Sequence, residues 1–550
     1  MAASSNIADI GNLELLKEEK NYPSYGMPDI NNFVLDGSKS IMPNDVQYPY
    51  LTESVSDKEC HFTQNPKLVI TFAHPHTSSG LTLYFVDDYP VLIKITWYTL
   101  AGTKLVSQEY QPESLSTYCP MQVDNYGKIE VEFLETRLPG QRIVCRYIKY
   151  GTAIKWAGET IQSATVVEEV DLTSASIPIN TATLSIVDEN NQFELSNHDG
   201  VWKSIQKRQE ITLTEELADK DIIVGTLFVD TWKSDSNIVT FNLIDRIGLI
   251  DKTKFYDGGV YTDEPAGTII DAIMQSAGVS QYTVANEVRA INVSGYLGIC
   301  SHREALQQVV FACGAVCNCG RTGEIQIYMP DRYADNTIGI DRQFMGTAVE
   351  MAEYVSGVAV TYKTYIAKEE TEEVYKDTLP AGDCTIEFSE PVTDLSITGG
   401  TVITAKPNYV IVRMEESAEC IINGRKYTVK EVTYTKNTEL LDAGEEPNIV
   451  SFGNCTLVNA ERVSVIAEYL LNYYQLRQVV TMSYLLDSEK TGDWVTIADV
   501  TGNTLTTALT SQTIDLSGGY IAQANARGYC KVTTDNAYTG EIYAGERGAV

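Results

Sequence analysis

The stretch "VGTLFVDTWKSDSNIVTFNLIDRIGLID" runs from Val224 to Asp251 and decides how the middle of the chain folds. Two segments rich in Val, Ile, Phe and Thr are separated by the polar segment "KSDSN". This composition predicts two strands joined by a turn. A short apolar segment follows, and the stretch contains no obvious catalytic group. It therefore indicates a structural β unit.

Before this stretch, the pattern of residues 56–155 predicts a β-sandwich of jelly-roll type. In "VLIKITWY", Ile93, Ile95 and Trp97 share one face, and in "KIEVEF" apolar residues alternate with Glu130 and Glu132. A period of two is typical of a strand with one buried face. About eight short strands in roughly 100 residues favour a sandwich.

Three segments carry apolar residues at helical spacing. "GTIIDAIMQSAG" (267–278) ends in a glycine, which is a typical helix stop. "SHREALQQVVFACG" (301–314) opens with Ser301 and Glu304 at the spacing of a capping box. "NAERVSVIAEYLLNYYQLRQ" (459–478) begins with Asn459, a favoured N-cap residue. We therefore predict helices in all three segments.

The rest of the chain is dominated by strand patterns, and Asn423-Gly424 predicts a hairpin turn because both residues tolerate positive φ. The predicted fold class is α+β and β-dominated, with several domains. They are an extended arm (1–55), the jelly-roll-like sandwich (56–155), a central domain with helices (156–350), a β-rich inserted domain (351–450) and a C-terminal helix with strands (451–550).

The formal net charge is −33, from 74 acidic and 41 basic side chains. Binding to nucleic acid needs Lys and Arg against phosphate, so a protein that grips DNA is disfavoured. An acidic channel that lets DNA pass is compatible with this charge, and so is a role in solubility alone. No apolar run reaches the ~20 residues of a membrane span. The N-terminal residues lack a secretory signal pattern, and eleven scattered cysteines indicate reduced thiols in a cytoplasm.

Few residues suggest chemistry. Cys313, Cys317 and Cys319 could bind zinc, but they lack the usual spacing, and packing as small apolar side chains is favoured. The pair His74 and His76 has no acidic or cysteine neighbours, so a surface loop is favoured over a metal site. His198-Asp199 has no legible nucleophile beside it. We predict no catalytic residue, no metal and no cofactor.

Aromatic residues of the first sandwich offer a candidate glycan-binding site. Tyr84, Trp97 and Tyr98 could stack on sugar rings, although Trp97 and Tyr98 fall on opposite faces of a regular strand. Packing in the core or in an interface is the favoured alternative.

Several motifs, taken in order, resemble those of bacteriophage baseplate hub and tail-tip proteins, a family related to the hubs of contractile injection systems. The likeness covers roughly residues 60–540. The matching motifs are "G-x-L-x-V" (Gly225, Leu227, Val229), "V-x-F-x-x-x-D-x-x-x-L" (Val239, Phe241, Asp245, Leu249), "REALQQV" (303–309) before Gly314-Ala315, "RxGxI" (Arg321, Gly323, Ile325), "GDWVTI" (492–497), "SGGYIAQANARGY" (517–529) and the paired segments "NPKLVITF" and "SSGLTLYF" of the first sandwich.

This resemblance implies a structural, non-enzymatic subunit with tube-like β-barrel elements. Copies, expected as a trimer, would form a ring joining the tail tube to a spike or fibres. The ring would be assembled in the host cytoplasm and carried in the virion tail, and DNA would pass without specific binding. Glu210, Asp230 and Asp235 are candidates for lining its lumen. The alternatives are a receptor- or glycan-binding tail protein that contacts the host cell wall, a hub-linked cell-wall hydrolase, and a monomeric glycan-degrading enzyme.

Overall fold

The computed structural model describes residues 25–26, 40–41, 50–52, 54–86, 88–150, 156, 158–189, 191–194, 196–197, 202, 208–216, 221–235, 237–438, 446–499, 503–517 and 519–530. The chain divides into two compact units. Unit 1 comprises residues 1–157 and 201–205, and unit 2 comprises residues 158–200 and 206–550. Most of the predicted N-terminal arm lies outside the described residues; its described parts include a short parallel pair, β1 (Tyr25–Gly26) and β2 (Ser40–Ile41).

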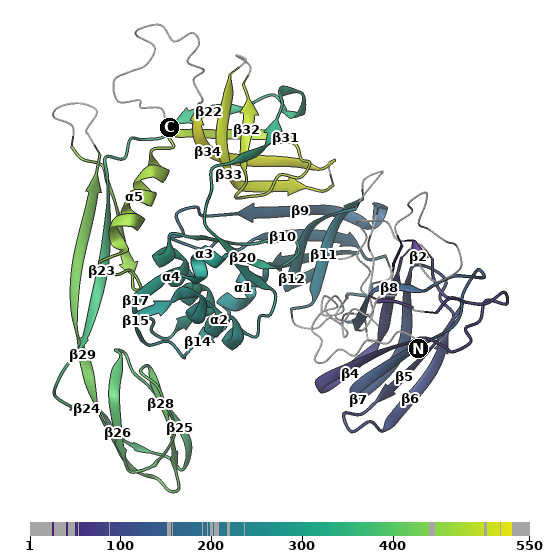
Figure 1. Ribbon diagram of the computed structural model, residues 1–550, viewed down its shortest axis with the longest axis horizontal. Helices are drawn as coiled ribbons and strands as arrows, with labels where there is room; N and C mark the ends of the chain where they lie inside the picture. The colour runs from purple at the N-terminus through teal and green to yellow at the C-terminus, as the bar shows by residue number, and fades with distance from the viewer. Residues whose placement is uncertain are drawn as a thin grey trace. The chain divides into compact units, whose positions relative to one another are not determined.

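Unit 1 contains a six-stranded sheet whose ends enclose one core (Figure 1). Among the described residues the sheet has six strands, two of which are long (19 and 20 residues), where the sequence predicts about eight short ones. In spatial order the six strands are β3 (Tyr50–Leu51), β8 (Val144–Tyr150), β4 (Lys67–Phe85), β7 (Ser116–Glu135), β5 (Leu92–Tyr98) and β6 (Lys104–Tyr110).

The two long strands of unit 1 explain how a single sheet makes a sandwich. The β4–β7 register shifts repeatedly between Thr71 and Gly80, so the pair bends there. Beyond the bend, β5 pairs with one end of β7 and β8 with the other end of β4. At Gly80 (φ +154°) a Cβ would lie 2.5 Å from the Cys119 carbonyl oxygen, so only glycine fits. Strands at both ends bury side chains in the same core.

Unit 2 is built on an eleven-stranded sheet that contains the opening stretch of the sequence. The predicted hairpin and the short apolar segment after it are confirmed as β12, β13 and α1 (Arg246–Asp251). The main path of the sheet runs through β11 (Glu210–Glu216), β12 (Asp221–Asp235), β13 (Ile238–Ile244), β10 (Thr181–Val187), β9 (Ile161–Glu169), β33 (Thr504–Asp515), β34 (Ile521–Cys530), β31 (Gln478–Leu485) and β22 (Ala348–Met351). From β33 a side branch leads to β32 (Trp494–Ala498), which pairs with β21 (Ala334–Ile338).

The predicted helices of unit 2 are present. The first is α2 (Ala266–Ala277), which ends at the left-handed Gly278. In α4 (His302–Cys313) the Ser301 hydroxyl accepts from the Glu304 N–H, as the capping pattern predicts. The third, α5 (Val463–Tyr474), begins later than expected, because Asn459 caps a preceding turn. The remaining small elements are β14 (Lys254–Phe255), β15 (Val260–Pro265), β16 (Tyr282–Val284), α3 (Asn286–Arg289), β17 (Asn292–Tyr296), β18 (Cys300–Ser301), β19 (Val316–Cys319) and β20 (Ile325–Tyr328).

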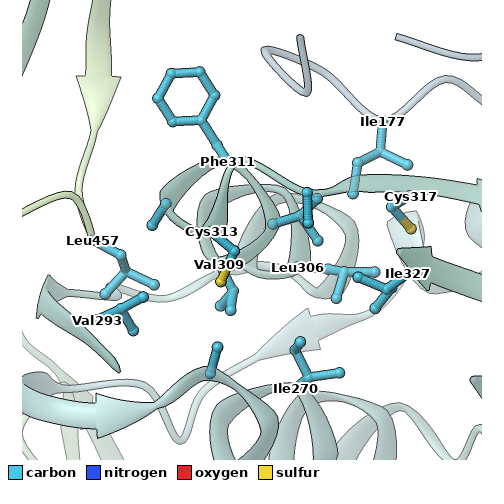
Figure 2. Packing of buried hydrophobic residues seen from close by; sticks show 14 of the residues in the cluster. Ile177, Ile270, Val293, Leu306, Val309, Phe311, Cys313, Cys317, Ile327 and Leu457 are labelled. Atoms are coloured by element: carbon cyan, nitrogen blue, oxygen red, sulfur yellow. The ribbon is translucent and has the colours of Figure 1, made fainter. Parts of the chain in front are cut away.

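The largest apolar core of unit 2 surrounds α4. Figure 2 shows Leu306 and Val309 of α4 among Ile270 of α2, Val293 of β17 and Ile327 of β20. Full burial of a Leu or Ile side chain is worth roughly 1.5–3 kcal/mol, so this layer is a major source of stability.

The region expected as an inserted domain contains a two-stranded ribbon and a small sandwich (Figure 1). We call the small sandwich the outer module. The second half of β29 (Ala418–Asn437) pairs with β23 (Gly357–Ala367) in the ribbon, which β30 (Ile449–Cys455) extends. The first half of β29 belongs to the outer module, together with β24 (Glu372–Leu379), β25 (Gly382–Glu387), β26 (Val392–Thr398), β27 (Thr401–Ala405) and β28 (Tyr409–Met414).

The hairpin predicted at Asn423-Gly424 is wrong, because both residues lie inside β29. Gly424 serves a close approach instead: a Cβ there would lie 2.3 Å from Val392 Cγ1. A glycine inside a strand often marks such a contact rather than a turn.

Besides the ribbon, side-chain hydrogen bonds join the outer module to the helical part of unit 2. The Asn408 side chain donates to the Leu297 carbonyl at 3.0 Å, and the Tyr409 hydroxyl donates to Asp257 at 3.1 Å. At Gly258 a Cβ would lie 2.4 Å from the Leu297 carbonyl oxygen, so the loop needs glycine to make this contact.

Candidate assembly interface

One face of the eleven-stranded sheet is lined by small polar side chains. Strand β10 shows the cause: Thr181, Thr183 and Ser185 alternate with Ala182 and Leu184, which face the core. The register extends this polar face across neighbouring strands in four rows: Lys233, Thr240, Ser185 and Ser163; Thr231, Asn242, Thr183, Thr165, Asp515, Ile521 and Leu485; Glu210, Phe228, Ile244, Thr181, Val167, Thr513, Gln523 and Ser483; and Glu169, Ser511, Asn525, Thr481 and Ala348.

Hydrogen bonds between neighbouring strands order these side chains. The Ser185 and Thr240 hydroxyls lie 3.1 Å apart, and the Asn242 amide donates to the Thr231 hydroxyl at 3.0 Å. On the C-terminal strands, Asn525 bonds with both Thr481 and Ser511. The four rows contain a single cationic side chain, that of Lys233. Six members of the rows are apolar, so the face is polar in part. Arg246 lies over the Phe228 ring, 5.1 Å from its centroid, and Arg527 follows Asn525 on the same face of β34, so positive charge is sparse on this face but not absent.

The three acidic residues predicted to line a lumen occupy different positions. Glu210 lies opposite Phe228 on the polar face, and Asp235 lies opposite Ile238 at the end of β12. Asp230 lies at an irregularity of β12 and forms an ion pair with Lys252, so its charge is partly compensated. Lumen lining by these residues stays a prediction.

Both ends of the main path of this sheet are open edges. Within the described residues, β11 pairs only with β12, and β22 pairs only with β31. An unpaired edge presents backbone N–H and C=O groups that can bond to another strand. The sheet is thus able to accept a further strand at each end.

The β22 edge carries exposed apolar side chains. Val349 and Met351 of β22 are exposed, and so are Phe344 and Met345 just before it and Leu485 on β31. Scattered exposed apolar residues are common, but a group along an open edge is typical of a protein contact. Leu485 belongs to the polar face, so we call only Phe344, Met345, Val349 and Met351 the β22 patch.

A buried ionic network joins the two halves of the sheet. Arg321 donates to Glu168 of β9 at 2.6 and 3.0 Å and to the Glu489 carbonyl at 2.9 Å. Arg342 donates to both carboxylate oxygens of Glu489, at 2.7 and 2.8 Å. Burial opposes ionisation of Glu489, but the bonds from Arg342 hold its pKa below the usual value. The network fixes β9 against the loop before β32.

The cysteines and histidines singled out in the sequence do not form a site in the described part of the chain. Cys313, Cys317 and Cys319 are buried in the core around α4, where Figure 2 shows the first two among aliphatic side chains. Burial raises the pKa of all three thiols, to about 12 for Cys313, which disfavours the thiolate that a metal requires. No group of three or more metal-binding side chains converges among the described residues.

The histidines give no catalytic arrangement either. The His76 ring packs on Phe72, with 4.4 Å between ring centroids. The side chain of His74 and both residues of the pair His198-Asp199 lie outside the described residues. No helix that the structure describes is both long and apolar enough to cross a membrane.

The three aromatic residues predicted to bind glycan differ in how far their side chains are buried. Trp97 is fully buried in the core of unit 1. Tyr98 is partly exposed; its hydroxyl donates to Glu130 at 2.8 Å, and the Lys128 ammonium lies 4.8 Å from its ring centroid. Tyr84 is also partly exposed. Of these three residues, Tyr84 and Tyr98 are partly exposed and Trp97 is not. Glycan binding by this set stays a prediction.

Sequence reasoning missed the β22 patch and the polar rows. The alternation "TATLSIV" in β10 could have revealed the polar face, because hydroxyl and apolar residues alternate with a period of two. No comparable signal marks β22, whose four residues are all exposed.

Comparisons with known proteins gave structural likeness only. No protein-family model matches the chain, and no curated protein matches it. Among solved structures, the 43 kDa tail protein of prophage MuSo2 from Shewanella oneidensis has 11% identity and a TM-score of 0.39, covering 68% of this chain and 94% of its own. A tail protein from Neisseria meningitidis has 10% identity and a TM-score of 0.39, covering 67% and 92%. A type VI secretion system component from E. coli has 8% identity and a TM-score of 0.34, covering 67% and 73%.

Proposed function

We propose that this chain is a structural subunit of the baseplate hub or tail tip of a phage, or of a phage-derived particle, and that it acts without catalysis. The observation that carries the proposal is the pair of open edges, β11 and β22, at the two ends of one continuous sheet. Within the described residues the main path of this sheet ends in two free edges, and the side branch ends in β21. Two free ends on one path are suited to pairing between subunits, which would leave neither of them exposed in a ring. The motifs resembling hub proteins support the same role.

In the proposed ring, β22 of one copy lies beside β11 of the next. The β22 patch is then covered, which removes exposed apolar surface from water. Cyclic symmetry requires each copy to offer one edge and receive the other, as two different edges allow. We propose three copies, as the resemblance to hub proteins implies.

The polar face of the sheet would line the lumen of this ring. Hydroxyl and amide side chains keep most of such a wall wetted, and Lys233, Arg246 and Arg527 are too few cations to hold phosphate firmly. Glu210 and Asp235 add negative charge to the wall. DNA would therefore pass without specific binding, and the ring would join the tail tube to a spike or fibres. The subunit would assemble in the host cytoplasm and reside in the virion tail.

Mass by light scattering, combined with negative-stain images, tests the ring. We expect a closed oligomer with a central hole. Val349→Lys combined with Met351→Lys should convert it to monomer, because charges on an edge strand oppose pairing. The matched control is Val402→Lys with Ile403→Lys, which places the same charges on β27, an exposed edge strand of the outer module. A monomer at every concentration, or rings that persist in the β22 variant, would refute the proposed contact.

Two further outcomes bear on the alternative functions. A host cell-wall glycan is a further partner that we propose for unit 1; Tyr98→Ala should weaken binding of the full chain to purified cell-wall polysaccharide, whereas Tyr333→Ala in unit 2 should not. Clearing of cell wall in a zymogram, lost on replacing one carboxylate, would instead identify a hydrolase and overturn the non-enzymatic assignment.

A further inference from the structure

Two cysteines of the outer module lie in facing sheets. Cys384 belongs to β25, in the sheet β25-β28-β27, and Cys420 belongs to β29, which pairs with β24 and β26. Both side chains contribute to the small core between these sheets: Cys420 is fully buried, and Cys384 is partly buried against it. Two thiols from opposite sheets therefore share one core.

The chain connection between the sheets brings the two cysteines to the same corner. The strands β24 and β25 are joined through Pro380 and Ala381 alone, so the sheets approach each other there. Cys420 pairs in register with Asp377, near the end of β24. The Cys384 sulfur lies 3.5 Å from the Pro380 carbonyl oxygen, just beyond the end of β24.

Electrostatic effects agree with this placement. Burial raises the pKa of the Cys420 thiol, and the neighbouring charge of Cys384 raises it further. The pKa of Tyr375 is raised by burial first, then by Asp377, and also by both thiols. The Tyr375 side chain on β24 packs against the same small core as both cysteines.

We propose that Cys384 and Cys420 form a disulfide that links the two sheets of the outer module when the protein meets an oxidising medium. Disulfides across two packed sheets are known in immunoglobulin domains, so the spacing of a sandwich permits them. The proposal does not depend on the ring. Cytoplasmic reductants keep such thiols reduced, and the bond would form after release from the cell.

The reaction needs a small-molecule disulfide, such as glutathione disulfide, as oxidant. The partly exposed Cys384 thiolate attacks one sulfur of this disulfide and releases one glutathione thiolate, which takes up a proton. The Cys420 thiolate then attacks the Cys384 sulfur of the mixed disulfide and releases the second glutathione. Two protein thiols are oxidised, and one glutathione disulfide is reduced to two thiols.

Mass spectrometry of the full-length protein tests the cross-link. Reduced protein is treated with glutathione disulfide, the remaining thiols are alkylated, and the digest is analysed without reductant. We expect a linked peptide pair containing Cys384 and Cys420, with a combined mass lower by the two thiol hydrogens. The thermal midpoint of the outer module should rise on oxidation, and reductant should reverse the rise.

Matched variants separate the cross-link from other oxidation. Cys384→Ser should abolish both the linked peptide and the reversible rise in midpoint, with the circular dichroism spectrum unchanged. Cys60→Ser, which changes another partly exposed cysteine, should leave both intact. A glutathione adduct on Cys384 with Cys420 still free, or no change at either cysteine, would show that the sulfur atoms cannot meet and would overturn the proposal.

Discussion

At the scale of single residues, the pair Arg321 and Glu168 is a buried ionic contact of unit 2. Both side chains are only 6% exposed and make two bonds with each other. Arg321→Met should lower the free energy of unfolding by about 3–5 kcal/mol, because it leaves a buried carboxylate without its partner. Chemical denaturation of unit 2, followed by tryptophan fluorescence, measures this loss.

The double variant Arg321→Met with Glu168→Leu is the control for this prediction. Replacing both charges with apolar groups should recover most of the loss, since no unpaired charge remains. Arg413→Met, which breaks a similar two-bond pair with Asp383 on the surface, should leave the denaturation midpoint nearly unchanged. Equal losses in the buried and surface variants would contradict the argument.

Asp245 predicts a pH dependence. Burial raises its pKa to about 7, although the Gly248 and Asn180 N–H groups donate to it. The folded state therefore holds this proton more tightly than the unfolded chain, where the pKa is about 3.9. Its stabilising contribution is complete below the unfolded pKa and is lost as the pH rises through about 7. Asp245→Asn should flatten this decline in the denaturation midpoint, whereas Asp341→Asn on the surface should preserve it.

Some residue roles could be read from the sequence and others could not. Ser301 and Gly314 carry local signals, because capping and left-handed turns depend on neighbours in the chain. The role of Arg321 could not be derived in this way: its partners Glu168 and Glu489 are distant in sequence, and a single sequence contains no information about which charges meet.

At the scale of elements, a glycine of the outer module and one that precedes β22 give a test of close packing. Gly399 (φ +100°) and Gly346 (φ +107°) have similar backbone conformations. A Cβ at Gly399 would lie 2.0 Å from the Glu419 carbonyl oxygen, whereas nothing lies within 4 Å at Gly346. Gly399→Ala should therefore lose roughly 1–3 kcal/mol more than Gly346→Ala, because overpacking adds to the same backbone strain.

Hydrogen exchange of peptides from β26, β27 and β29 is the measurement for this pair. Faster exchange in those strands for Gly399→Ala, and unchanged exchange there for Gly346→Ala, is expected. If the two variants behave alike, backbone strain alone accounts for the need for glycine at Gly399.

Element type was predictable where periodicity is strong and local. The hairpin of β12 and β13, the helices α2 and α4, and the β-dominated class follow from spacing and composition. The bend in β4 and β7 was not predictable, since an irregular register is determined by both strands together. The turn predicted at Asn423-Gly424 was wrong for a related reason. Glycine is needed there because the Val392 side chain of the neighbouring strand packs closely against it, and local turn propensity does not report that contact.

At the scale of the whole molecule, the sequence indicates many strands but not which edges stay open. Edge status depends on the order of strands, and β9 pairs with β33, more than 300 positions later in the chain. The buried network of Arg321, Glu168 and Glu489 links the same distant segments. The candidate interface is thus a product of long-range topology, which explains why its residues carry no short motif.

The net charge of −33 gives a final prediction about assembly. Copies that approach each other repel because both are acidic, and salt screens this repulsion. The apolar contact made by the β22 patch is not strengthened by low salt. The fraction of oligomer should therefore rise as ionic strength increases from roughly 0.05 to 0.5 M, over which the Debye length shortens severalfold. Light scattering at fixed protein concentration measures this, and the variant Val349→Lys with Met351→Lys should stay monomeric throughout. A fall in oligomer with added salt would mean that ion pairs hold the copies together, and the contact would then have to be sought away from the β22 edge.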